Sequence, residues 1–210
     1  MGTQARSYRS PRRAQQAAET RATVLCAASE LFTSRGWSGT SMRDIATAAG
    51  VSVETIYSSQ GSKTELLLAA VEAGVVGDFD TMALAERPEF AAIGSGSLDQ
   101  RAAKLAELGT AAHRRTAGLL LALREAAVTD EAAARRLAEL DEQRRDDLAR
   151  ALTLITGNEV AGELLDGLWA ISAAEVYDAL TRRTGWTDLQ YQTWATDVLI
   201  RLLQPQKDIS

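Results

Sequence analysis

The sequence predicts an all-α protein with a small N-terminal domain and a larger C-terminal one. Only three prolines occur in 210 residues, and Ala, Leu, Arg and Glu, which favour helices, are abundant. The period-two alternation of Val, Ile and Thr that marks strands is absent from the sequence. Apolar residues make up 46% and charged residues 24%, so the chain can form a substantial core and lacks the composition of a disordered protein.

The chain opens with a basic arm. Residues 1–13 hold four arginines and no acidic residue, so we expect a disordered segment there. A helix then fits about residues 15–34, where apolar side chains recur at helical spacing: Val24, Leu25, Ala28, Leu31 and Phe32. Cys26 lies within this helix, and we expect it to be a small, partly buried apolar side chain. A lone cysteine forms no internal disulfide, which fits a reducing cytoplasm.

The stretch TSMRDIATAAGVSVETIYSSQGSK, residues 40–63, predicts two short helices joined by a tight turn. Ser41 can cap the first helix, and Asp44 completes a capping box. Gly50 supplies the left-handed conformation that the end of a helix prefers. Ser52 can cap the second helix, from which two side chains are expected to return to the core: Ile56 and Tyr57. A second helix held at a wide angle to the first can lie in the major groove of DNA.

This stretch resembles the DNA-binding domain of the tetracycline-repressor (TetR/AcrR) family. The matching residues are Thr40, Ile45, Ala46, Ala49, Gly50, Val51, Ser52, Thr55, Ile56, Tyr57, Ser62, Lys63, Leu66 and Leu67, preceded by Ala27, Leu31, Phe32, Gly36 and Trp37. One departure is Ser59-Gln60, where the family usually has an aromatic pair. That aromatic wedges the end of the second, reading helix against the first helix of the domain, so the pose of this end stays open.

The resemblance implies a transcriptional regulator, and the expected function is a repressor released by a small hydrophobic effector. It divides the chain into a helix-turn-helix domain at residues 14–61, a connecting helix at 62–76, and a ligand-binding and dimerisation domain at 77–210. It also implies a homodimer, joined through its last two long helices, on a palindromic DNA operator. The alternative is a helical interaction protein of the same fold that has lost DNA binding, which Ser59 and Gln60 motivate.

Eight residues are candidates for DNA contact. Four have the residue types, at the positions matching the family, that hold phosphates: Ser41, Thr55, Tyr57 and Lys63. Ser52, Val53 and Glu54 begin the reading helix, the end that usually meets base edges. Val53 could touch a thymine methyl group, and Glu54 could accept from a cytosine amino group or face away. Arg43 is a candidate for a guanine or a phosphate. The arginines of the arm could reach phosphates or a minor groove, or could form a solvated tail.

The distribution of charge is uneven along the chain. Residues 1–65 carry eight basic and five acidic side chains, whereas the rest of the chain carries 15 basic and 23 acidic ones. A basic N-terminal third on an acidic body is typical of a DNA-binding domain on a body that phosphate does not attract. A difference of this size could also arise by chance.

The C-terminal domain is expected to follow a composition break at residues 77–97, where Pro88 and a GSGS run indicate a flexible connection. The expected helices cover about residues 98–115, 116–127, 130–156, 158–183 and 187–202. The third has acid-before-base pairs four residues apart on its outer face: Glu131–Arg135, Asp141–Arg145 and Asp146–Arg150. Apolar residues off the main stripes, Ile171, Tyr177 and Leu199, predict a second partner surface.

The chemistry of an enzyme is missing from the sequence. One histidine and one cysteine cannot form a His/Cys metal site or a Cys-His nucleophile pair, so we expect no catalytic residue, metal or cofactor. His113 is expected at the surface or the edge of a pocket, with contact to a ligand as the alternative. Leu120, Trp169 and Tyr177 are candidates to line an effector pocket or to lie in the core. No stretch is long and apolar enough to predict a membrane partner.

Overall fold

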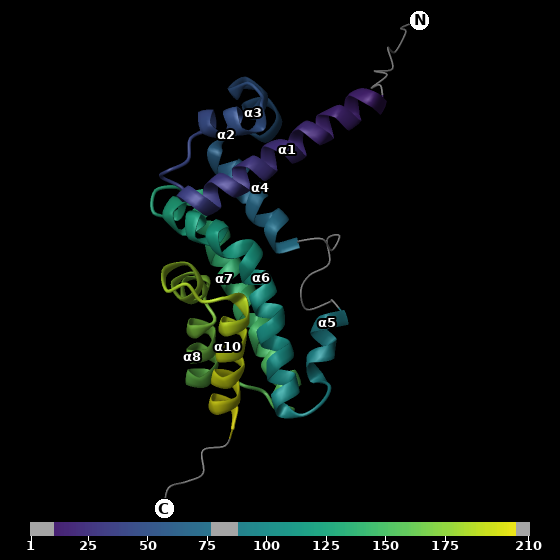
Figure 1. Ribbon diagram of the computed structural model, residues 1–210, viewed down its shortest axis with the longest axis vertical. Helices are drawn as coiled ribbons and strands as arrows, with labels where there is room; N and C mark the ends of the chain where they lie inside the picture. The colour runs from purple at the N-terminus through teal and green to yellow at the C-terminus, as the bar shows by residue number, and fades with distance from the viewer. Residues whose placement is uncertain (1–10, 77–87, 205–210) are drawn as a thin grey trace, which may run out of the picture.

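The computed structural model describes residues 11–76 and 88–204, and all regular structure in these ranges is helical (Figure 1). The predicted all-α fold class is thereby confirmed. The segments are α1 (Pro11–Arg35), α2 (Met42–Ala49), α3 (Val53–Gln60), α4 (Lys63–Val76), α5 (Pro88–Ala91), η2 (Ala92–Gly94), α6 (Leu98–Ala127), α7 (Glu131–Thr156), α8 (Gly162–Ile171), α9 (Ala174–Asp178), the π-helical η3 (Ala179–Arg183) and α10 (Asp188–Leu203).

Two of the expected segments fall partly outside this range. Residues 1–10 of the predicted arm and residues 77–87 of the predicted connection lie outside the described residues. Residues 11–13 were expected in the arm but belong to α1, which begins at Pro11. A proline is favoured in the first turn of a helix, because its missing N–H would have no partner there.

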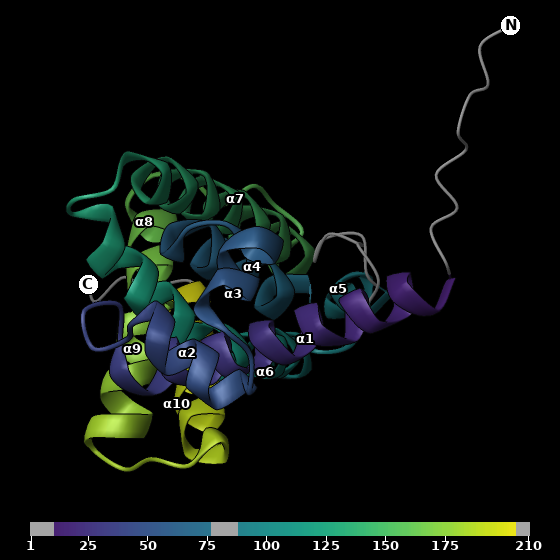
Figure 2. The same cartoon turned by 90° about the horizontal axis from the view of Figure 1, so that it is seen from above.

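The head of the molecule is formed by α1 to α4, and α2 and α3 lie at the end opposite α8 and α10 (Figure 1). Seen from above, α1 crosses the top of α6 (Figure 2). The core of the head holds fully buried side chains from all four helices: Phe32, Ile45, Ile56, Leu66 and Leu67. Leu119 and Leu123 of α6 belong to the same apolar cluster. The head and the top of the body therefore share one core.

The turn between α2 and α3 forms as the sequence predicts. The Ser41 hydroxyl accepts from the Asp44 N–H at 3.1 Å, and Asp44 accepts from the Ser41 N–H at 3.0 Å. Gly50 has a φ of 67°, and the Ser52 hydroxyl accepts from the Thr55 N–H at 3.2 Å. The capping box thus fixes the start of α2, and the left-handed Gly50 and the Ser52 cap form the turn into α3.

The long helix α6 corrects one prediction. Two helices, 98–115 and 116–127, were expected, but Leu98–Ala127 is continuous. Thr116 does not cap a new helix, because its hydroxyl donates back to the Ala112 carbonyl at 2.9 Å. This local bond is compatible with an uninterrupted helix.

The expected helix over residues 158–183 is also wrong, because the chain breaks at Ser172 and Ala173. The Nη1 of Arg144, on α7, donates to the Trp169 carbonyl at 2.8 Å and to the Ser172 carbonyl at 3.4 Å. The Ser172 hydroxyl donates to the Trp169 carbonyl at 3.1 Å. Carbonyls at the end of α8 therefore find partners without the next helical turn, which allows α9 to leave in a new direction.

The charged face of α7 pairs differently from the prediction. Glu131 and Arg135 form the expected ion pair at 2.8 Å. Arg145 instead contacts Asp166 of α8 at 2.6 Å, and Arg150 pairs with Asp147, one turn away. Partners from another helix, or three residues away, replace two of the three expected pairs, since exposed pairs of this kind differ little in energy.

Candidate DNA-binding surface and effector cavity

Most of the eight candidate DNA-contact residues lie at the surface of the head. Five are exposed: Ser41, Arg43, Ser52, Glu54 and Tyr57. Val53, Thr55 and Lys63 are half-buried. Tyr57 is 55% exposed, so the expectation that it faces the core is wrong, whereas Ile56 is fully buried. Neighbouring residues of a helix point about 100° apart, so the narrow contact of α3 with the core accommodates only one of them.

Glu54 is held at the first turn of α3. Hydrogen bonds from its own backbone N–H and from Ser52 lower the pKa of its carboxyl group below the ordinary value. A carboxylate is favoured at this end of a helix by the free N–H groups. In this arrangement the Glu54 carboxylate stabilises the first turn of α3.

Lys63, at the start of α4, is engaged inside the head. Its Nζ donates to the Trp37 carbonyl at 2.6 Å and lies 3.8 Å from the centre of the Trp37 ring. Burial lowers its pKa from the ordinary value, although the charge of Glu125 opposes this shift. An ammonium group has three N–H donors, so donors remain for a phosphate while one holds Trp37.

Gln60 occupies the place of the missing aromatic at the end of α3. Its side chain is only 9% exposed, and its Nε2 donates to the Arg21 carbonyl of α1 at 3.3 Å. A buried amide with a backbone partner can join two helices, as an apolar wedge would. The pose of this end of the reading helix could not be predicted from the sequence, because the partner lies 39 residues away in the chain.

Cys26 lies on the exposed side of α1, which corrects the expectation that it is partly buried. Its Sγ lies 3.8 Å from Oε1 of Glu30, one turn along the helix. The buried stripe of α1 runs through Val24, Ala27 and Ala28, three and four residues apart, whereas Cys26 lies two residues after Val24 and points to another side of the helix.

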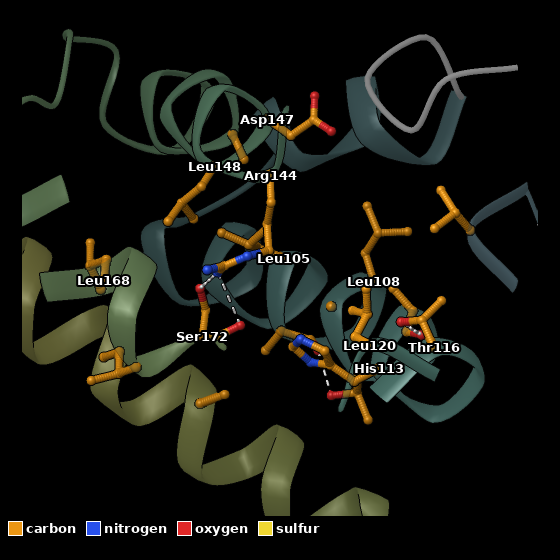
Figure 3. A pocket seen from close by; sticks show the side chains of 18 of the residues that line it. Leu105, Leu108, His113, Thr116, Leu120, Arg144, Asp147, Leu148, Leu168 and Ser172 are labelled. Carbon is orange, nitrogen blue, oxygen red and sulfur yellow. Dashed lines mark hydrogen bonds between the residues drawn. The ribbon is translucent and has the colours of Figure 1, made fainter. Parts of the chain in front are cut away.

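The body contains a partly open cavity of about 430 Å³. Its walls come from α4, α5, α6, α7, α8 and α10, and they include Val75, Leu105, Leu108, Leu120, Leu140, Leu148, Leu168, Ile171 and Val198. Figure 3 shows some of these side chains around the space. A volume in this range and a mostly apolar wall are typical of sites for small molecules.

Two of the four candidate ligand residues line this cavity, His113 and Leu120. Trp169 and Tyr177 lie behind the wall. The guanidinium carbon of Arg144 lies 4.6 Å from the centre of the Trp169 ring. The Tyr177 ring stacks on His113 at 5.4 Å, and its hydroxyl donates to Asp188 at 2.6 Å. Arg144 was not predicted as a site residue, because in the sequence of α7 it resembles a surface arginine.

Polar groups gather where α6, α7 and α10 meet at the cavity wall. Burial and the charge of Arg144 lower the pKa of His113 to about 4, although the Ser172 backbone opposes the shift. Burial raises the pKa of Tyr191 to about 12, so its hydroxyl keeps its proton. At neutral pH this part of the wall therefore presents the neutral imidazole of His113, the neutral phenol of Tyr191 and the guanidinium of Arg144.

Other kinds of site are not found in the described ranges 11–76 and 88–204. No group of three or more His, Cys, Asp or Glu side chains there could hold a metal ion. In the same residues, no helix has both the length and the apolar character needed to cross a membrane.

Comparison with known proteins identifies the head. Residues 24–70 match the family model described as "Bacterial regulatory proteins, tetR family". No curated protein matches the chain.

Three solved structures illustrate the shared fold. A linker-substituted mutant of HlyIIR is 15% identical, with a TM-score of 0.62 over 92% of this chain and 100% of that one. A Rhodococcus sp. protein assigned to the TetR family is 19% identical, with a TM-score of 0.61 over 89% and 100%. The TetR-family regulator PfmR from Thermus thermophilus is 16% identical, with a TM-score of 0.58 over 88% and 95%. Residues 24–70 therefore match the helix-turn-helix domain of the TetR family, and the whole chain has the all-α fold of these solved structures.

Proposed function

We propose that this protein is a dimeric repressor that acts in the cytoplasm and leaves its operator when a small, largely apolar molecule fills the cavity. Its proposed domains are the helix-turn-helix at residues 14–61, the connecting helix at 62–76 and the ligand-binding and dimerisation domain at 77–210. The observation that carries the proposal is that Glu72 and Val75 of α4 line the cavity, while the other end of α4 begins with Lys63, a candidate DNA contact that also holds Trp37. One helix thus touches both sites.

DNA binding is supported by the exposed face of α2 and α3. Ser52, Val53 and Glu54 would meet base edges, while Ser41, Thr55, Tyr57 and Lys63 would hold phosphates, and Arg43 either. Two copies of α3 in a two-fold dimer require a near-palindromic site with half-sites about 35 Å apart. Footprinting on the promoter of the protein's own gene tests this. An asymmetric footprint, or no retardation of that DNA in a gel shift, would favour the alternative of an interaction protein without DNA binding.

The dimer is supported by α8 and α10, which contribute side chains to the same apolar cluster of the body. They leave large apolar side chains at the surface, with Leu164 37%, Leu189 71% and Leu202 45% exposed. A permanent interface buries on the order of 2,000 Å² or more and resembles a core cut in half. We expect a dimer by light scattering at micromolar concentration, and a monomer there would refute it. Leu164→Asp should weaken the dimer, whereas Val128→Asp, 81% exposed at the α6–α7 turn, should not.

Release by a ligand can be tested through the linkage between the two binding equilibria. A ligand that weakens DNA binding by some factor must itself bind more weakly to the DNA complex by the same factor. The contacts that would carry the effect join α4 to the body: Thr64 donates to Asp130 at 2.7 Å, Arg136 pairs with Glu72, and Arg115 donates to the Gly74 carbonyl at 3.4 Å. Equal ligand affinities with and without operator would refute the proposed release.

A further inference from the structure

Some of the titratable groups that line the cavity have ion-pair partners, whereas others have a polar atom without a partner in the described part of the chain. Arg136 pairs with Glu72 and with Glu139, and Asp147 pairs with Arg150. Figure 3 shows the Asp147 carboxylate pointing away from His113. Among these lining groups, Arg144 and His113 are the ones with an unmatched polar atom within the described residues.

Arg144 is held firmly, yet it is incompletely bonded. Its Nη1 donates to the Trp169 carbonyl at 2.8 Å and to the Ser172 hydroxyl at 3.1 Å, and its guanidinium stacks on Trp169. Its Nη2 is buried and has no hydrogen-bond partner in the ranges 11–76 and 88–204. A buried charged donor without an acceptor is costly and rare. The guanidinium therefore has capacity for one more acceptor.

His113 lies near this guanidinium and has the same deficit. Its Nδ1 is also buried and has no partner in the described part of the chain. The Tyr177 ring stacks on one side of His113, and the Tyr191 ring meets it edge-on at 6.2 Å. Figure 3 shows Arg144 and His113 entering the site from different helices. A carboxylate only accepts hydrogen bonds, so the Nδ1 must carry the proton to meet one, which one of the two tautomers of a neutral imidazole allows.

The nearby acidic side chains do not neutralise Arg144 fully. Asp141 accepts from Nη2 of Arg124 at 3.2 Å and 3.4 Å, but its oxygen lies 4.0 Å from Nε of Arg144. Glu175, the other nearby acid, pairs with Arg124 as well. Arg124 thus holds both acids closely, and Arg144 is left with a distant one. A ligand carboxylate would complete the set, whereas an ammonium group would meet an unfavourable charge.

We propose that the cavity binds an amphipathic acid, with an apolar body along the leucine wall and one carboxylate that meets Arg144 and His113. This inference rests on the proposed effector function of the cavity and specifies the chemical class of the effector. The apolar wall gives affinity with little selectivity, while the head group decides which apolar molecules are accepted.

The test compares three probes of equal chain length: a medium-chain fatty acid, its alcohol and its amine, each below its critical micelle concentration. Calorimetry at pH 7 should show the acid bound roughly ten- to hundredfold more tightly than the alcohol, because charged hydrogen bonds are stronger, and the amine bound most weakly. Acid and alcohol of equal affinity, or no binding by the acid, would overturn the proposal.

Two variants test whether the carboxylate of the ligand binds at Arg144. Arg144→Gln should lose most of the preference for acid over alcohol, while Arg145→Gln, which removes the neighbouring α7 arginine paired with Asp166, should keep it. If Arg144→Gln fails to fold, His113→Leu serves instead and should reduce the same preference. An unchanged preference in the folded variant, or an equal loss in Arg145→Gln, would contradict the assignment.

DNA binding is measured separately with the same probes. An alcohol that binds as well as the acid and releases DNA would refute the head-group proposal and leave the repressor function standing. An acid that binds selectively without changing DNA affinity would support the head-group proposal and refute release by the cavity.

Discussion

Acidification from pH 7 to pH 5 is expected to destabilise this protein through one side chain, His113. It is the only histidine in the 210 residues, so no other side chain of that type titrates in this window. Burial and the charge of Arg144 lower its pKa from the ordinary 6.5 to about 4. The unfolded chain therefore takes up a proton near pH 6.5, whereas the folded protein does so only near pH 4. The stability from this group is complete above pH 6.5 and is lost as the pH falls.

The size of the effect follows from the two pKa values. Each unit of pKa difference corresponds to about 1.4 kcal/mol, so the free energy of unfolding should fall by about 2 kcal/mol between pH 7 and pH 5. His113→Gln removes the titrating group and should lose much less over this interval. The nearby Tyr177 and Tyr191 do not contribute, because burial raises both of their pKa values to about 12.

Urea unfolding at a fixed protein concentration measures this, with the wild type and the variant compared at both pH values. Concentration must be fixed because a dimer gains stability by mass action. Carboxylates begin to titrate near pH 5, so the informative quantity is the difference between the two proteins. Arg114→Gln, an exposed neighbour on α6, is the control and should behave as wild type. Equal losses in the wild type and in His113→Gln would show that water reaches the imidazole and that the reasoning is wrong.

Three further predictions concern the head. Lys63→Ala should weaken binding to all DNA sequences about equally and make the salt slope shallower by about one unit; an unchanged slope in a salt titration would mean that Lys63 serves only the Trp37 carbonyl. Val53→Ala should relax preference at one base position per half-site and cost about 1 kcal/mol or less, as selection from randomised operators would detect. Gln60→Ala should lower the free energy of unfolding by about 1 kcal/mol, because the hydrogen bond that joins α3 to the Arg21 carbonyl of α1 is lost; urea unfolding showing no loss would refute the role of Gln60.

The head could be predicted closely from the sequence because its signals are local. The capping residues Ser41 and Ser52 lie within three positions of their partners, and Gly50 acts on its own backbone. Gln60 and Lys63 could not be placed in this way, since their acceptors lie 39 and 26 residues away. The prediction was thus accurate where the chemistry is between neighbours and incomplete where two helices meet.

The candidate site in the body could not be predicted fully for the same reason, because its contacts join different helices. Arg144 is one of several arginines on α7, and nothing in its local sequence separates it from Arg145. The difference lies in what faces each: Arg144 meets the broken end of α8, whereas Arg145 meets Asp166 at the surface. The break after α8 was missed for the same reason, because the carbonyls freed there are satisfied by a residue from another helix. Helical periodicity carries no information about such partners.

The geometry of α6 bears on how a filled cavity could act on DNA. His113 lies at the cavity, and twelve positions later Glu125 accepts from the Ser38 N–H at 3.1 Å, in the loop between α1 and α2. Twelve residues of helix span about 18 Å, so one continuous element joins the polar end of the cavity to the head. The α4 helix forms a second such connection, from Val75 to Lys63. Because both helices also share the apolar cluster of the head, a ligand that shifts one against the other changes the support of α2 and α3 directly, and no chain of individual side-chain movements is required.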